Sequence, residues 1–152
     1  MKFTQSCTIT ADRQTVWDFL MNMQNVANCL AGVQALRPID ADTYEGTLRV
    51  KVGPVSLTFQ GTVHVETRDR EQWHGAVRAE ARDHKLGGGV QAHMDMNLLE
   101  KSPAETEMQV ALETHILGKI GEFGQPVIRK KTATMLQDFA TQVSQQLLAR
   151  QT

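Results

Sequence analysis

The stretch that decides the fold is Gly118–Leu148, GKIGEFGQPVIRKKTATMLQDFATQVSQQLL. Glycines come first, and apolar or small residues then recur with the i, i+3, i+4, i+7 spacing of one helical face. These residues are Ile128, Thr132, Met135, Leu136, Phe139, Ala140, Val143 and Leu147. Because the charged residues lie off this stripe, the stretch predicts one long helix with an apolar side that packs against a broad partner.

The segments before this helix have the pattern of β-strands. From residue 44 onward, apolar residues occupy every second position in five successive segments: 48–52, 57–65, 77–81, 92–98 and 108–116. Turn-forming residues separate them, among them Gly53-Pro54 and Ser102-Pro103. Strands with one apolar and one polar face are typical of an antiparallel sheet that is covered on its apolar side. The sequence therefore predicts a curved antiparallel sheet covered by the C-terminal helix.

The first forty residues complete the predicted order of elements. Residues Lys2–Thr10 alternate as a strand, and Asp12 can cap a short helix. A second short helical segment, Val26–Leu30, ends at Gly32, and strand signals return at Val33–Ile39. The predicted order is β-α-α-β-β-β-β-β-β-α. This order is that of an α+β fold, and we expect a single domain over residues 1–152.

Composition excludes several classes of partner. The chain has 152 residues and a formal net charge of -1, so no strong positive field attracts nucleic acid. No export signal or apolar run of about 18 residues is present, which predicts a soluble, cytoplasmic protein.

Cys7 and Cys29 lack CxxC or zinc-ribbon spacing. We expect both to be buried small apolar residues rather than a disulfide.

The sheet face that meets the helix is the place where a site would be enclosed, and its predicted residues are almost all apolar. General acid–base catalysis needs a titratable group near the substrate, and none is predicted there. No catalytic residue is therefore predicted. Two interpretations remain open, a filled core and an apolar cavity. Small residues at Gly61, Ala79, Ala81 and Ala92, together with several methionines, favour a cavity.

Histidines and glycines do not form a recognisable cofactor motif. The strand alternation places His64, His74, His93 and His115 on the polar face, and no HExxH spacing occurs, so no metal site is predicted. The glycines of Gly118–Gly124 lack the GK[ST] ending of a phosphate-binding loop.

Several segments along nearly the whole chain resemble a known family. They are Val16–Leu20 (VWDFL), Cys29–Val33 (CLAGV), Tyr44–Gly46 (YEG), Lys51–Val55 (KVGPV), Phe59–Gly61 (FQG) and Gly118–Gly124 (GKIGEFG). Together they resemble the CoxG proteins of carbon monoxide dehydrogenase systems, which belong to the START-like (SRPBCC) helix-grip superfamily. The family usually has proline at the position of Ala31.

The resemblance implies a fold and a function. The implied fold is a seven-stranded antiparallel sheet wrapped around the C-terminal helix, with a lipophilic cavity between them. Family members accompany molybdenum-containing hydroxylases of the carbon monoxide dehydrogenase type, and are thought to recruit the enzyme to the membrane or to carry a quinone-like electron acceptor. We therefore expect a non-enzymatic accessory protein with a quinone- or lipid-like ligand and with peripheral contact at the inner membrane face.

The predicted cavity lining comes from both the strands and the helix. It consists of Phe59, Val63, Met94, Met96, Met108, Val110, Met135, Leu136, Phe139 and Val143. Two alternatives remain. If one strand is out of phase by a residue, His93, Asp95 or His115 turns inward, and a START-like enzyme of the cyclase or hydratase type becomes the better hypothesis. The third hypothesis is an assembly or maturation factor without a ligand.

Overall fold

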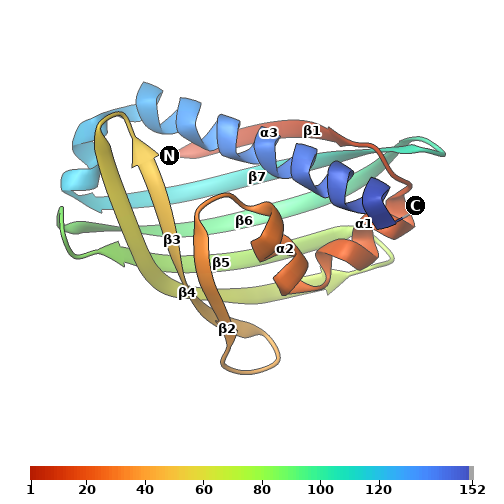
Figure 1. Cartoon of the computed structure of the whole chain (residues 1–152), viewed down its shortest axis with the longest axis horizontal. Coiled ribbons are helices and arrows are strands. Elements are labelled where there is room, and N and C mark those ends of the chain that lie inside the picture. The colour runs from red at the N-terminus through yellow and green to blue at the C-terminus, as the bar shows by residue number, and fades with distance from the viewer. Residues whose placement is uncertain (151–152) are drawn as a thin grey trace.

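Seven strands form one antiparallel sheet in the order β1-β7-β6-β5-β4-β3-β2 in the computed structural model, which describes residues 1–150 (Figure 1). The strands are β1 (Lys2–Ile9), β2 (Val33–Pro38), β3 (Thr43–Val52), β4 (Val55–Asp69), β5 (His74–Asp83), β6 (Gly88–Ser102) and β7 (Glu105–Gly118). The helices are α1 (Arg13–Leu20), α2 (Met23–Cys29), the 3-10 helix η1 (Lys119–Phe123) and α3 (Gln125–Arg150). The curved sheet and the long C-terminal helix confirm the predicted helix-grip fold.

The glycine-rich segment leads into the long helix, as predicted, but it also contains a short helix that the sequence did not predict. It forms the separate 3-10 helix η1, and α3 begins only at Gln125. Gly118 and Gly124 flank η1 with φ of 72° and 85°. A right-handed helix does not contain such left-handed φ values, whereas glycine adopts them readily. The two glycines therefore separate η1 from the strand before it and from the helix after it.

Strand pairing confirms the predicted faces of the sheet. Val63 lies opposite Ala79, which lies opposite Ala92, so the three side chains share the concave face. Two positions further along the strands, Val77 lies opposite Met94 on that same face. Residues directly opposite one another in adjacent strands project to the same side, which is why the alternation of each strand extends across the sheet.

Helix α3 lies along β1, at one edge of the sheet (Figure 1). The backbone N–H of Thr10 donates to Ser144 Oγ at 3.0 Å, and Arg129 Nη1 donates to the carbonyl oxygen of Lys2 at 3.0 Å. The stripe predicted from the sequence is buried unevenly. Its last four residues, from Phe139 onward, are buried, whereas its first four are only half-buried.

The hydrophobic core occupies one end of the fold, which we call the packed end. Its buried residues are Cys7, Ile9, Ala11, Val16, Trp17, Phe19, Leu20, Cys29, Met96, Leu98, Met108, Val110, Phe139, Ala140, Val143 and Leu147. Helix α1 covers this end. Asp12 caps the N-terminus of α1 by accepting a hydrogen bond from the backbone N–H of Thr15 at 3.1 Å. Both cysteines are buried and outside any disulfide, as predicted.

Candidate functional site

An apolar pocket of about 290 Å³ lies between α2 and the concave face of β2–β6. It is lined by Met23, Val26, Ala27, Leu30, Val33, Ala35, Leu36, Gly46, Thr47, Leu48, Phe59, Gly61, Thr62, Val63, Ala79, Glu80, Ala81, Val90 and Ala92. None of these residues is fully buried, because the pocket is open on one side. We call this part of the fold the pocket end.

Small residues form the floor of the pocket. Gly61 lies opposite Ala81, and Ala79 lies opposite Ala92 in the next pair of strands. These are the four small residues that favoured a cavity in the sequence. Gly61 has a second role, because a Cβ atom at this position would lie 1.9 Å from the carbonyl oxygen of Glu80. Only glycine allows β4 and β5 to approach so closely here.

Helix α2 forms the wall opposite the sheet. Asn22 caps it by accepting from the backbone N–H of Gln24 at 2.9 Å, and Gln24 Nε2 donates to the carbonyl oxygen of Leu36 in β2 at 3.1 Å. After α2 the chain passes Gly32, where φ is 95° and a Cβ atom would lie 2.1 Å from the carbonyl oxygen of Arg49. These contacts hold α2 over β2 and β3.

The predicted lining did not include α2. The signal was present, because Met23, Val26, Ala27 and Leu30 have the i, i+3, i+4, i+7 spacing of one helical face. With seven residues, α2 has only two turns, so this pattern is easily overlooked.

The structure divides the ten predicted lining residues into two groups. Phe59 and Val63 line the pocket. The other eight lie elsewhere: Met96, Met108, Val110, Phe139 and Val143 are buried at the packed end, Met94 and Leu136 pack against that cluster, and Met135 is half-buried on α3. Because α3 lies over β1 and none of its described residues lines the pocket, the helix half of the predicted lining is displaced from it. Contact of those eight residues with a ligand stays a prediction.

The buried polar groups already have partners. Across residues 1–150, no buried side-chain nitrogen or oxygen lacks a hydrogen bond. Thr106 Oγ1 donates to the carbonyl oxygen of Ala11 at 2.8 Å. Asp83 accepts from the backbone N–H groups of Leu86, Thr58 and Lys85, each at 2.8 Å. These hydrogen bonds, that of Leu86 foremost, hold the pKa of Asp83 below its usual value and fix the β5–β6 turn.

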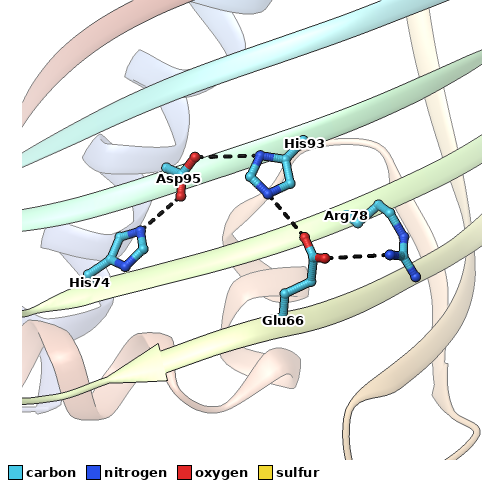
Figure 2. Close-up of polar contacts among 5 residues, drawn as sticks. All are labelled: Glu66, His74, Arg78, His93 and Asp95. Atoms are coloured by element: carbon cyan, nitrogen blue, oxygen red, sulfur yellow. Dashed lines mark hydrogen bonds and ion pairs between the residues drawn. The ribbon is translucent and has the colours of Figure 1, made fainter.

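Ionisable groups gather instead on the convex face of the sheet (Figure 2). His74 Nε2 lies 2.8 Å from Asp95 Oδ1, and His93 Nδ1 lies 3.4 Å from Asp95 Oδ2. Glu66 Oε1 lies 3.0 Å from His93 Nε2, and Glu66 Oε2 lies 3.4 Å from Arg78 Nη1. The predicted strand phase is therefore correct here, and neither His93 nor Asp95 points into the pocket.

The third residue of the enzyme hypothesis, His115, is exposed.

Within residues 1–150, no group of histidine, cysteine, aspartate and glutamate side chains has an arrangement that could hold a metal ion. None of the helices in this same range is both long enough and apolar enough to cross a membrane.

Solved structures share this fold over nearly their whole length. A conserved protein from Geobacillus kaustophilus has a TM-score of 0.89 at 17% identity, with 98% of this chain and 96% of that chain covered. A START superfamily protein from Mycobacterium smegmatis has a TM-score of 0.67 at 11% identity, with 97% of each chain covered. A point mutant of norcoclaurine synthase from Thalictrum flavum, in complex with a transition state analogue, has a TM-score of 0.72 at 13% identity, covering 100% and 96%. At these identities the likeness shows the fold alone.

The sequence itself identifies the family. A search of curated proteins found no match. The family model of CoxG, a subunit of carbon monoxide dehydrogenase, matches residues 6–148, which is nearly the entire chain. This chain therefore belongs to the carbon monoxide dehydrogenase CoxG family.

Proposed function

We propose that this protein is a non-enzymatic accessory protein that binds a hydrophobic ligand, quinone-like or lipid-like, in the pocket between α2 and the sheet. The observation that carries the proposal is the half-exposed apolar lining. Leu48, Phe59 and Val63 keep part of their surface accessible inside a concave pocket that α3 does not cover. Burying apolar surface contributes roughly 25 cal/mol per Å², so an apolar molecule placed there is stabilised mainly by the area it covers.

The partner that membership of the CoxG family supports is a molybdenum hydroxylase of the carbon monoxide dehydrogenase type. In this role the protein would deliver an electron acceptor to the enzyme or recruit it to the inner face of the membrane. Exposed residues around η1 support a peripheral membrane contact. Leu117 and Val127 are exposed there, beside the exposed cations Lys119 and Lys130. Apolar side chains next to lysines suit the boundary between lipid headgroups and acyl chains.

Native mass spectrometry of protein purified gently from its own host tests the ligand, followed by organic extraction and identification of the bound molecule. We expect a stoichiometric apolar molecule in the wild type. Ala79→Leu, which fills the pocket floor, should lose it. Ala111→Leu is the matched control, because Ala111 lies opposite Asp95 on the convex face. A ligand-free wild type that also fails to bind added quinones and lipids would contradict the proposal and favour an assembly factor.

A pull-down from the same host tests the partner. The tagged protein should retain a molybdenum hydroxylase, identified by mass spectrometry of its subunits. Retention by Ala79→Leu as well would mean that the partner recognises the protein with or without its ligand. Absence of any such enzyme from the retained proteins would contradict the assignment of the partner.

A further inference from the structure

We infer that the pocket takes head-and-tail molecules in one orientation, with an apolar tail against the floor and a single polar head at the open side. The inference rests on the proposed function, because it concerns the ligand of the same pocket. It names a narrower ligand class, that of molecules with one polar end, and it places that polar end where a partner protein can reach it.

The first step is the absence of a polar anchor on the pocket floor. Thr47, Thr62 and Glu80 are the polar residues of the lining. Each is adjacent in its strand to a residue of the concave face, and successive side chains of a strand project to opposite faces. Thr62 lies opposite Glu80, and both are exposed. Their side chains thus belong to the convex face, and the floor itself is glycine and alanine.

The second step concerns the interior next to the floor. Thr114 lies opposite Ala92 and is the nearest buried hydroxyl by strand position. Its Oγ1 donates to the carbonyl oxygen of Met1 at 3.4 Å, and Thr114 is not among the residues that line the pocket. Every other buried side-chain polar atom between residues 1 and 150 has a partner too. A ligand hydroxyl or carbonyl placed on the floor would therefore lose its water without gaining a hydrogen bond. Such a loss weakens binding by about tenfold or more.

The third step is the open side of the pocket. On α2, the pocket-facing residues Val26, Ala27 and Leu30 are half-exposed, and so is Leu36 of β2. A polar group at this rim keeps its water while the rest of the molecule covers the floor. The orientation with the more favourable binding free energy therefore has the tail inward and the head outward.

Two small ligands of equal length separate the orientations. We would measure displacement of the fluorescent probe 1-anilinonaphthalene-8-sulfonate by 1-decanol and by 1,10-decanediol. The diol must bury one hydroxyl, so after correction for its water–octanol partition it should bind about tenfold more weakly than decanol. Equal corrected affinities would overturn the inference. Failure of both alcohols and of longer apolar molecules to displace the probe would instead contradict the proposed function itself.

A variant supplies the missing hydrogen-bond partner. Ala79→Ser adds one hydroxyl to the floor at little cost in volume, and it should reduce the disadvantage of the diol several-fold. Ala111→Ser, on the convex face, should leave the ratio of the two affinities unchanged. An unchanged ratio in Ala79→Ser, with both alcohols still bound, would contradict the role of the floor.

A direct measurement of orientation completes the test. Decanol carrying ¹³C at its hydroxyl carbon or at its terminal methyl is bound to the wild-type protein, and a water-soluble gadolinium chelate is added. The hydroxyl carbon should relax several-fold faster than the methyl carbon. The opposite order would overturn the inference while leaving binding intact.

Discussion

The packed end and the pocket end share strand β6 but differ in the size of its side chains. On its concave face, β6 carries Val90 and Ala92 toward the pocket and Met96 and Leu98 toward the core. Ala92, Met96 and Leu98 follow the same alternation, so all three were assigned to the covered face. The difference teaches that alternation decides which face a residue occupies, whereas side-chain volume decides if the space is filled.

The two ends also differ in what covers them. Helices α1 and α3 close the packed end, where Ala140 and Val143 have no exposed surface. Among the helices of residues 1–150, the two-turn helix α2 alone contributes residues to the pocket lining. We therefore expect substitutions at the packed end to change the free energy of unfolding, and substitutions at the pocket end to change ligand binding.

The largest expected difference is between two identical changes, Val143→Asp and Val63→Asp. Val143 is 0% exposed, so a buried carboxylate there should cost more than about 4 kcal/mol of unfolding free energy and prevent folding. Val63 is half-buried beside the open pocket, and its variant should fold but lose binding of an apolar probe. Circular dichroism and probe fluorescence measure the two outcomes. If both variants unfold, the distinction between the two ends is wrong.

The second comparison uses two phenylalanines from the predicted lining. Phe139→Ala removes a side chain that is 9% exposed in the core, and it should cost about 3–5 kcal/mol. Phe59→Ala removes a half-exposed pocket side chain, and it should cost about 1 kcal/mol while weakening the ligand. Urea denaturation followed by circular dichroism gives both values. Equal costs would mean that the pocket is packed as tightly as the core.

The third comparison concerns two glycines on the concave face. Gly61→Ala would place its Cβ 1.9 Å from the carbonyl oxygen of Glu80 and 2.6 Å from Cα of Ala81. The strands would have to separate, at a cost of about 1–3 kcal/mol, and the pocket floor would change shape. In Gly75→Ala, the nearest atom is Met96 Cε at 3.5 Å, an ordinary contact, so we expect a change within about 0.5 kcal/mol. Thermal unfolding distinguishes them, and similar melting temperatures would show that β4 and β5 separate easily.

The sequence predicted most of the fold but only part of the site. The alternation predicted the strands, their faces and the convex position of His93. Once one face of a strand is apolar, its two-residue period determines the face of every other side chain in that strand. It also predicted the small floor residues around Gly61. The position of α3 was not predictable in this way, since a helical stripe shows which side is buried but not which strand it meets. Phe139 and Val143 were therefore assigned to the lining although α3 carries them into the core.

The smallest expected effect concerns the β5–β6 turn at the pocket end. It tests whether hydrogen bonds stabilise this part of the fold, which lacks a packed core. Asp83 is 2% exposed, and the backbone N–H groups that it accepts from lower its pKa. A carboxyl whose folded-state pKa is lowered stabilises the fold above its unfolded pKa of about 3.9, and this contribution is lost as the pH falls through the folded-state value. Asp83→Asn should thus cost about 1–2 kcal/mol at pH 7, because an amide N–H would face the N–H of Thr58.

The cost of Asp83→Asn should shrink as the pH falls below about 4, where the wild type loses the same interaction. Urea denaturation of both proteins between neutral and acid pH measures this convergence. Asp40 provides the matched control, because hydrogen bonds from Asp42 and Thr43 also lower its pKa, but it is exposed in the β2–β3 loop. Water can replace its hydrogen bonds, so Asp40→Asn should change stability much less. A pH-independent difference between wild type and Asp83→Asn would show that the turn is held by shape rather than by charge.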